Sequence, residues 1–194
     1  MFKNILCPVD MQPRSKMALK KAITIAHQFN SKIILLNIHE EFMSKKQMVM
    51  SRVSVSALGE EFKKIATEAK NEMKNLMKDL EAENVECEYI LRDGIPSDII
   101  IKISNEMKVD LIVMGTNGTP RGVMKRVIGS NAERVVRLAH CPVITIKGKN
   151  HKNGCENIIL PLDLEKQTKE KVTLAIEYAR YWNATIRVVS RVPS

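Results

Sequence analysis

Hydrophobic residues recur with two different spacings along the chain, and these spacings predict alternating strands and helices. Continuous or alternating apolar runs predict five strands, at residues 3–9, 32–38, 85–91, 109–115 and 142–147. Apolar residues three or four apart mark four helices between them, and in the first helix these are Ala18, Leu19, Ala22, Ala26 and Phe29. This alternation predicts an α/β fold, an open, doubly wound, five-stranded parallel sheet that is Rossmann-like in kind.

Single residues support the predicted boundaries. Asn30 is the expected stop signal of the first helix, and Pro96 suits the first turn of the third. The segment 41–57 breaks the pattern, because it mixes Lys, Ser and Met without a clear period. It is interpreted as a connection or as an extended start of the second helix. A lid or a surface for a partner is the alternative interpretation.

The beginning of the chain recurs near its end. A shift of 153 residues (163 − 10) aligns NILCPVD, from Asn4, with NIILPLD, from Asn157. Further matches fall on core and turn positions: Ala22, Ile23, Ala26, Asn30 and Ile33 recur as Ala175, Ile176, Ala179, Asn183 and Ile186. This internal repeat covers a strand, a helix and a second strand. We therefore expect a complete domain at 1–148, a linker at 149–155 and a partial second copy at 156–194.

Composition places the chain among soluble globular proteins, with 44% hydrophobic and 27% charged residues. No apolar stretch reaches the length of a membrane span, and the first residues lack the pattern of a signal peptide. The expected location is the cytoplasm. The four cysteines are scattered without a C-x-x-C pair, so they are interpreted as reduced thiols, and no metal site is expected.

The formal net charge of +9 indicates either attraction for phosphates or a lysine-rich solvated surface. Only 8 aromatic residues are present (4 Phe, 3 Tyr and 1 Trp), which disfavours a base-stacking platform for single-stranded nucleic acid. No nucleic-acid-binding module is visible either. A phosphate group in a small ligand is therefore favoured over a nucleic-acid backbone.

Two features lie where an open α/β sheet binds its ligands, beyond the carboxyl ends of the strands. Asp10 follows the first strand. After the fourth strand, Gly115 and Gly118 allow a ligand to approach the backbone, and residues 129–131 (GSN) open a helix whose N–H groups favour an anion. Structural roles are the alternative: residues 130–133 (SNAE) fit a capping box, the glycines fit turns, and Asp10 can cap the first helix. Spacing alone leaves both interpretations open.

The order of these motifs resembles that of the universal stress protein family. The similar features are P-x-D after the first strand (Pro8, Asp10), G-x-x-G after the fourth (Gly115, Gly118), G-S-N at the next helix, CPVITIK at the fifth strand and the tandem repeat. The resemblance covers the whole chain. It implies the family's adenine-nucleotide-binding fold, with strand order 3-2-1-4-5, and a homodimer that pairs through the fifth strand.

The resemblance also implies a set of site residues. The adenosine half is implied at the ends of the first two strands, by Pro8, Val9, Asp10 and the backbone of Ile38. The floor beneath the ribose is implied at Met114 and Gly115. The phosphate cradle is implied at Gly118, Gly129, Ser130 and Asn131. The implied ligand is ATP, with Mg²⁺ carried by the nucleotide rather than by a protein cage. The spacer of ten residues between Gly118 and Gly129 is one residue longer than in ATP-binding members.

Three functions are compatible with these motifs. The first is a cytoplasmic ATP-binding module in regulation or stress response. The second is a slow ATPase or nucleotidyl-transfer enzyme on the same pocket, and the third is a nucleotide-free dimeric scaffold. Asp10 is the only obvious carboxylate in the pocket motifs, and His39 is the only imidazole near them. A lone histidine is more often a neutral neighbour than a catalyst, so no catalytic residue is assigned and the first function is favoured.

Overall fold

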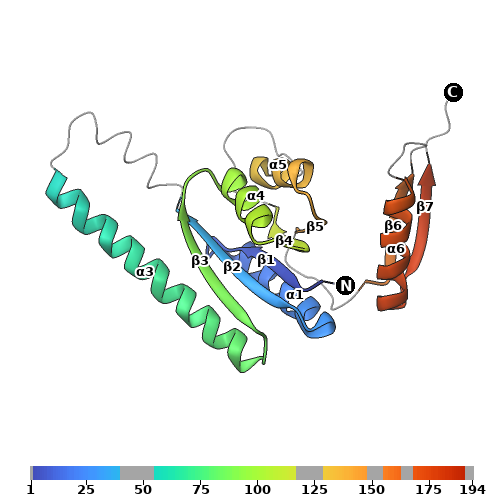
Figure 1. Cartoon of the computed structure of the whole chain (residues 1–194), viewed down its shortest axis with the longest axis horizontal. Coiled ribbons are helices and arrows are strands. Elements are labelled where there is room, and N and C mark those ends of the chain that lie inside the picture. The colour runs from blue at the N-terminus through green and yellow to red at the C-terminus, as the bar shows by residue number, and fades with distance from the viewer. Residues whose placement is uncertain (1, 40–54, 117–128, 148–154, 163–167, 191–194) are drawn as a thin grey trace. The chain divides into compact units, whose positions relative to one another are not determined.

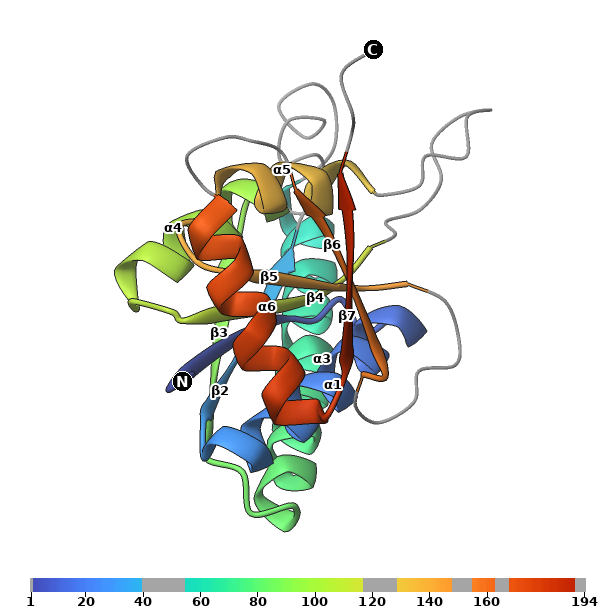
Figure 2. The ribbon, with the colours of Figure 1, turned by 90° about the vertical axis from the view of Figure 1, so that its right-hand side faces the viewer.

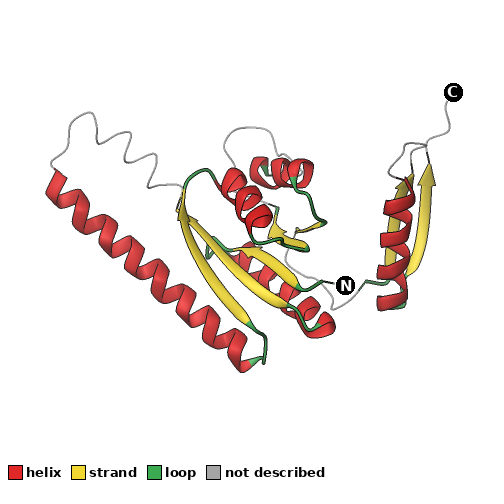
Figure 3. Cartoon of the chain, viewed as in Figure 1, coloured by secondary structure: helices red, strands yellow, loops and turns green. Residues whose placement is uncertain are grey.

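The computed structural model describes residues 2–39, 55–116, 129–147, 155–162 and 168–190, which fall into two units, Met1–Lys149 and Asn150–Ser194. The first unit holds a five-stranded parallel sheet in the order β3-β2-β1-β4-β5 (Figure 1). Its elements are β1 (Asn4–Pro8), α1 (Pro13–Phe29), β2 (Lys32–His39), α3 (Val55–Ala82), β3 (Cys87–Asp93), α4 (Pro96–Glu106), β4 (Leu111–Gly115), α5 (Ser130–Leu138) and β5 (Val143–Ile146). This order and alternation confirm the predicted fold class (Figure 3).

The helices lie on both faces of this sheet. The chain runs from β1 outward to β2 and β3, then returns past β1 to β4 and β5. Because crossovers between parallel strands are right-handed, α1 and α3 lie on one face and α4 and α5 on the other (Figure 1). The change of direction between β1 and β4 creates the switch point at which sheets of this kind bind ligands.

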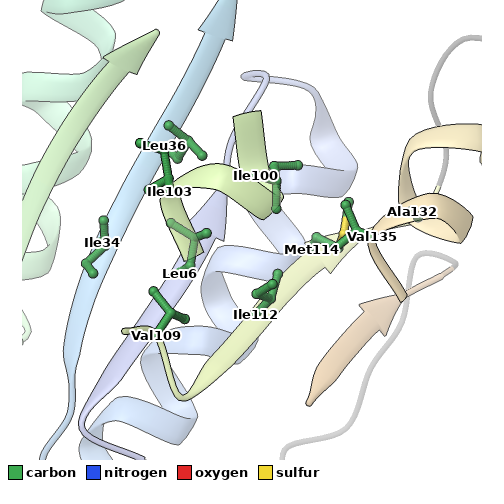
Figure 4. Packing of buried hydrophobic residues seen from close by; sticks show 10 residues of the cluster. All are labelled: Leu6, Ile34, Leu36, Ile100, Ile103, Val109, Ile112, Met114, Ala132 and Val135. Carbon is green, nitrogen blue, oxygen red and sulfur yellow. The ribbon is translucent and has the colours of Figure 1, made fainter. Parts of the chain in front are cut away.

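A hydrophobic cluster fills the space between the sheet and the two helices α4 and α5 (Figure 4). The strands contribute alternate residues to it, and the helices contribute residues three apart, as the two periodicities require. The cluster consists of Leu6, Ile34, Leu36, Ile100, Ile103, Val109, Ile112, Met114, Ala132 and Val135. Removing such side chains from water supplies about 25 cal/mol per Å² of apolar area, so this face is a principal source of stability for the first unit.

The predicted starts of two strands are wrong, because β3 and β4 each begin two residues after the expected start, and β3 also ends two residues later than expected. Val85 and Val109 instead close the preceding helices, and the N–H of each valine donates 3.0 Å to the carbonyl five residues back. The residues before them, Asn84 (φ 55°) and Lys108 (φ 49°), adopt the left-handed conformation that this kind of helix ending requires. The two valines are therefore apolar because they seal helix ends.

Other predicted boundaries are confirmed. Asn30 ends α1 in the left-handed conformation (φ 50°), and Pro96 occupies the first turn of α4. α3 begins at Val55, so the last residues of the unpatterned segment 41–57 belong to this helix. The rest of that segment lies outside the described residues, so the structure does not test whether it is a connection, a lid or a partner surface.

The second unit repeats the first strand, helix and strand of the chain. Its elements are β6 (Asn157–Leu162), α6 (Thr168–Trp182) and β7 (Thr185–Ser190). β6 and β7 form a parallel pair, and α6 packs against both strands (Figure 2). The register is the same in both copies, since Ile5 pairs with Ile33 and, 153 residues later, Ile158 pairs with Ile186. The sequence repeat is thus also a structural repeat.

Candidate functional site

The carboxyl ends of β2, β1 and β4 lie side by side at one edge of the sheet, because these strands are parallel neighbours (Figure 1). This edge brings together the predicted residues that follow β1, the end of β2 and the end of β4. They are Pro8, Val9, Asp10, Ile38, Met114 and Gly115. The predicted Gly118 lies outside the described residues.

The ladder between β1 and β2 stops one hydrogen bond short of its regular continuation. Its last register pair is Pro8 with Leu36, and the Val9 N–H donates 2.8 Å to the Leu36 carbonyl. The regular next bond in a parallel ladder would run from the Ile38 N–H to the Val9 carbonyl. Instead the Asn37 amide nitrogen Nδ2 donates 2.7 Å to that carbonyl. The backbone of Ile38 therefore faces the switch point beyond the last paired residue.

Asp10 forms a turn that leads into α1 but does not cap the helix. The N-cap of α1 is Gln12, which makes no side-chain cap hydrogen bond. The Asp10 carboxylate accepts a 3.0 Å hydrogen bond from the Gln12 N–H, which is an Asx turn. The buried Ser15 hydroxyl accepts from the Asp10 N–H at 3.3 Å and donates to the Gln12 carbonyl at 3.0 Å. Asp10 itself is exposed, so its carboxylate is accessible to a ligand.

Close packing against α1 explains the glycine at position 115, in addition to its candidate role in binding. A Cβ atom at this position would lie 3.3 Å from the Arg14 carbonyl carbon and 3.4 Å from the Arg14 Cβ and carbonyl oxygen. The first turn of α1 therefore approaches β4 more closely than a side chain permits comfortably. Met114, one residue earlier, is buried in the cluster beside Val135 (Figure 4).

Thr116 joins the end of β4 to the end of β5 and to the start of α5. Its N–H and hydroxyl donate to the Ile146 carbonyl at 3.1 and 3.3 Å. Its own carbonyl accepts the Gly129 N–H at 2.5 Å. The connection 117–128 lies outside the described residues, but its two ends are hydrogen-bonded to each other. The start of α5 is therefore fixed at the switch point.

The first turn of α5 has no side-chain cap. The N-cap is Gly129, and Ser130 is the first residue of the helix, so the capping-box interpretation of Ser130 is wrong. The first helical hydrogen bond runs from the Glu133 N–H to the Gly129 carbonyl at 2.9 Å. A helix gives no internal partner to the three preceding amides, those of residues 130–132. Together with the helix dipole, these amides form a site that favours negative charge.

An ion pair holds this helix start against α4. The Arg134 guanidinium lies 2.7 Å from the carboxylate of Asp98, which belongs to the first turn of α4. Both side chains are nearly half exposed, so the pair contributes little energy, about 0–1 kcal/mol. The pair bridges the two helices, whose relative position depends on the buried residues that both contribute to the hydrophobic cluster.

The cysteines of the first unit are unsuited to nucleophilic chemistry. Burial raises the pKa of the Cys7 thiol to about 12. Burial, with a smaller contribution from the Asp110 carboxylate, raises the pKa of Cys141 to about 11. Both thiols are protonated near neutral pH, and only a thiolate attacks or binds a metal well. Within the described ranges, no group of three or more His, Cys, Asp or Glu side chains could hold a metal ion.

The sequence pattern missed Asn37, Ser15 and Thr116, all of which are buried polar residues at this edge. Asn37 carried a signal, since it is the only polar residue inside the run IILLNI. Ser15 and Thr116 carried none, because small hydroxyl residues occur in every turn. Their roles become visible through hydrogen bonds that the fold creates.

The described fold and site define an α/β domain of the doubly wound kind with an anion-favouring helix start at its switch point. Residues 1–147 match the universal stress protein family, and the chain belongs to this family. None of the helices in the described part of the chain is long and apolar enough to cross a membrane.

Individual relatives agree with this assignment. Universal stress protein MJ0577 of Methanocaldococcus jannaschii is 33% identical over 159 residues, which cover 77% of this chain and 98% of that protein. Its solved structure superposes with a TM-score of 0.64 at 31% identity, over 78% of this chain and 99% of that one. Universal stress protein UspA from Lactobacillus plantarum gives a TM-score of 0.60 at 25% identity, over 75% and 98% of the two chains.

A further structure, of a protein from Pseudomonas aeruginosa UCBPP-PA14, matches over the full length. It covers 100% of this chain and 63% of the other, with a TM-score of 0.68 at 18% identity. At this identity the likeness concerns the fold alone.

Proposed function

We propose that the first unit binds ATP and acts as a regulatory or stress-response module of the universal stress type. The observation that carries this proposal is the start of α5. Among the described residues, the amides of residues 130–132 have no helical partner, and the Gly129–Thr116 hydrogen bond ties this helix start to the end of β4. An uncapped helix start at the edge that carries the exposed Asp10 suits a ligand with an anionic end and a polar, hydrogen-bonding end. Membership of the family supports an adenine nucleotide.

The adenosine half of the proposed site is formed after β1 and at the end of β2. The exposed Asp10 carboxylate accepts hydrogen bonds from ribose hydroxyls or from the base, and Pro8 and Val9 contact the adenosine beside it. The Ile38 backbone offers one donor and one acceptor beyond the last β1–β2 ladder bond, which suits the edge of adenine. Met114 is buried and Gly115 has no side chain, so both support the ribose through their backbone.

The phosphates are bound by the start of α5 in this proposal. Gly129 and Asn131 supply backbone N–H groups, Ser130 adds a hydroxyl donor, and Gly118 permits close approach from the preceding loop. The hydrogen bond between Gly129 and Thr116 supports this role despite the longer spacer, since it ties the helix start to β4 independently of loop length. Mg²⁺ arrives with the nucleotide.

Binding without rapid catalysis is the favoured version of this function. Among the described residues named for the pocket, Asp10 is the only carboxylate, and burial raises the pKa of the Cys7 thiol, one residue before Pro8. A slow ATPase or nucleotidyl-transfer activity would need a base to orient water. We place the protein in the cytoplasm by resemblance to its family.

A homodimer through β5 is part of the proposal. Among the described residues β5 is the edge strand of the first sheet, so the backbone groups on its outer side can pair with a second copy. Sedimentation velocity at micromolar concentration tests this pairing. We expect a dimer for the unmodified chain and a monomer for Thr145→Lys, which places a charge on the edge. A monomeric unmodified chain would contradict the pairing.

Calorimetric titration of the intact protein with Mg-ATP tests the nucleotide site. We expect binding by the unmodified chain and loss of binding when Gly118 is replaced by valine, because a side chain blocks the approach of the phosphates. Gly122 lies in the same loop outside the motif, so Gly122→Val is the matched control. Absence of heat and of thermal stabilisation at millimolar Mg-ATP would exclude the ATP site and favour the nucleotide-free scaffold.

A further inference from the structure

Asn37 is a buried polar residue in the otherwise apolar body of β2. It is 5% exposed, and the four residues before it, Ile33 to Leu36, are all buried aliphatic residues. Its Nδ2 donates to the Val9 carbonyl at 2.7 Å, whereas its Oδ1 is shielded from solvent and has no hydrogen-bond partner among the described residues. A buried polar atom without a partner costs stability, so packing alone does not account for an asparagine here.

The bond that Asn37 makes replaces a bond of the sheet. Even-numbered residues of β2 direct their backbone groups toward β1, as the bonds from the Lys32 N–H and to the Leu36 carbonyl show. The N–H of Ile38 is the next in this series, and its regular acceptor is the Val9 carbonyl. The described structure gives this carbonyl the Asn37 donor but no bond from Ile38, and the register ends at Leu36, so the Ile38 N–H has no partner on β1 among the described residues.

The same bond also anchors the turn that carries Asp10. The Val9 carbonyl and the Asp10 N–H belong to one planar peptide group, so a donor on the carbonyl orients the amide as well. That amide donates to Ser15, and the turn continues through Met11, whose φ of 61° is rare for a residue other than glycine. Such a conformation persists where surrounding bonds hold it. Asn37 and Ser15 hold it from opposite sides.

We infer that Asn37 is a positioning residue of the nucleotide site, which withholds the Val9 carbonyl from the ladder so that the Ile38 N–H and the Asp10 turn face the adenosine. The inference rests on the proposed function and gives Asn37 no direct contact with the ligand. The second copy of the repeat supports it. This copy has Ser190 at the position of Asn37, and its register continues to the pair of Leu162 with Ser190, one pair further than in the first copy.

Ser31 provides a matched control at the opposite end of β2. Its hydroxyl donates 2.7 Å to the Phe2 carbonyl, and the residue is 4% exposed. Ser31, directly before β2, and Asn37, near the end of β2, thus each join a buried side chain to a backbone carbonyl just beyond one end of β1. Ser31 lies at the edge away from the switch point. Loss of a buried hydrogen bond is common to variants of both residues, whereas loss of site positioning is expected at Asn37 alone.

Hydrogen exchange on the ligand-free protein gives the first test. In Asn37→Leu the Val9 carbonyl becomes available to Ile38, so we expect the Ile38 amide to exchange at least fivefold more slowly than in the unmodified chain. A purely structural role for Asn37 predicts faster exchange there instead. Ser31→Ala should leave the Ile38 amide unchanged. Unchanged or faster exchange at Ile38 in Asn37→Leu overturns the inference.

Calorimetry on the same intact proteins gives the second test. We expect Asn37→Leu to lower the affinity for adenosine and for ATP at least tenfold and to leave the affinity for inorganic pyrophosphate unchanged. Ser31→Ala should bind all three ligands like the unmodified chain. Asn37→Ser, which copies the second repeat, is the second variant if leucine disturbs folding, with the same expectation. Equal loss of ligand affinity in Asn37→Leu and Ser31→Ala, or full adenosine affinity in Asn37→Leu, overturns this inference but leaves the proposed function standing. Absence of ATP binding by the unmodified chain overturns the proposed function and this inference with it.

Discussion

The two copies of the repeat share their local structure but differ in their surroundings. Leu6 and Leu36 of the first copy are 0% exposed, whereas their counterparts in the second, Ile159 and Val189, are 68% and 55% exposed. In the described part of the chain, α4 and α5 cover this sheet face in the first unit. No described element of the second unit covers the equivalent face. The same strand–helix–strand pattern therefore produces a core in one place and a surface in the other.

One residue of the buried face in the first copy is replaced by a charged residue in the second copy. Ile34 of the first copy is 1% exposed in the cluster, and its counterpart in the second copy is Arg187. The Arg187 Nε donates 3.1 Å to the Asn157 Oδ1 on an exposed surface. An arginine at the place of a core isoleucine indicates that this face is not part of an apolar core. The local fold can thus be kept while the role of a face changes.

Matched truncations should give the largest difference between the copies. Leu6→Ala removes a fully buried side chain and leaves a cavity, so we expect the free energy of unfolding of the first unit to fall by about 2–5 kcal/mol. Ile159→Ala removes an exposed side chain, and we expect a change within about 0.5 kcal/mol. Chemical denaturation of both variants measures this. A cost of several kcal/mol for Ile159→Ala would show that its face is buried against another surface.

The acidic residues that follow β1 and β6 should differ in nucleotide binding. Asp163, the counterpart of Asp10, belongs to the second unit and lies outside the described residues, whereas the start of α5 belongs to the first unit. Asp10→Ala removes a charged acceptor, so we expect ATP affinity to fall about tenfold or more, roughly 1.4 kcal/mol. Asp163→Ala should leave it unchanged. Calorimetric titration decides, and equal losses would contradict the assignment of binding to the first unit.

A methyl group at Gly115 should disturb a contact between α1 and β4, for which the described elements of the second unit have no counterpart. The added Cβ would lie 3.3–3.4 Å from Arg14, at the point where α1 packs on β4. We expect Gly115→Ala to destabilise the first unit by about 1 kcal/mol, as mild overpacking does. Thermal unfolding measures the effect. A neutral result would mean that α1 moves aside at no cost, and would leave ligand approach as the main reason for this glycine.

The helix endings should give the smallest effects, and the same effect in both copies. Asn30 and Asn183 have φ of 50° and 51°, and the next N–H in each case donates to the carbonyl five residues back. Alanine is less tolerant of this conformation, so we expect each Asn→Ala variant to cost about 1 kcal/mol or less. Exchange of the Ser31 and Ala184 amides should accelerate to a similar extent. A large difference between the two would show that surroundings also control the helix endings.

Part of the candidate site could be predicted from the sequence, and part could not. Asp10, Gly115 and residues 129–131 are recognisable because they follow strands and open a helix. Their surroundings were not recognisable: the sequence allowed Ser130 to be an N-cap, but the structure makes Gly129 the N-cap. Asn37 and Thr116 act on carbonyls 28 and 30 residues away. Such pairings arise from strand order, which no local pattern contains.

The sequence by itself determined the alternation of strands and helices, the left-handed helix endings at asparagine and the repeat of strand, helix and strand. Each of these depends on backbone preference and on periodicity within about one helix or strand. Only the tertiary structure decided that Leu6 is core while Ile159 is surface, that Gly115 makes room for α1, and that Asn37 takes the Val9 carbonyl from Ile38. Burial and hydrogen-bond competition depend on which distant segments become neighbours, and the order of the strands sets those neighbours.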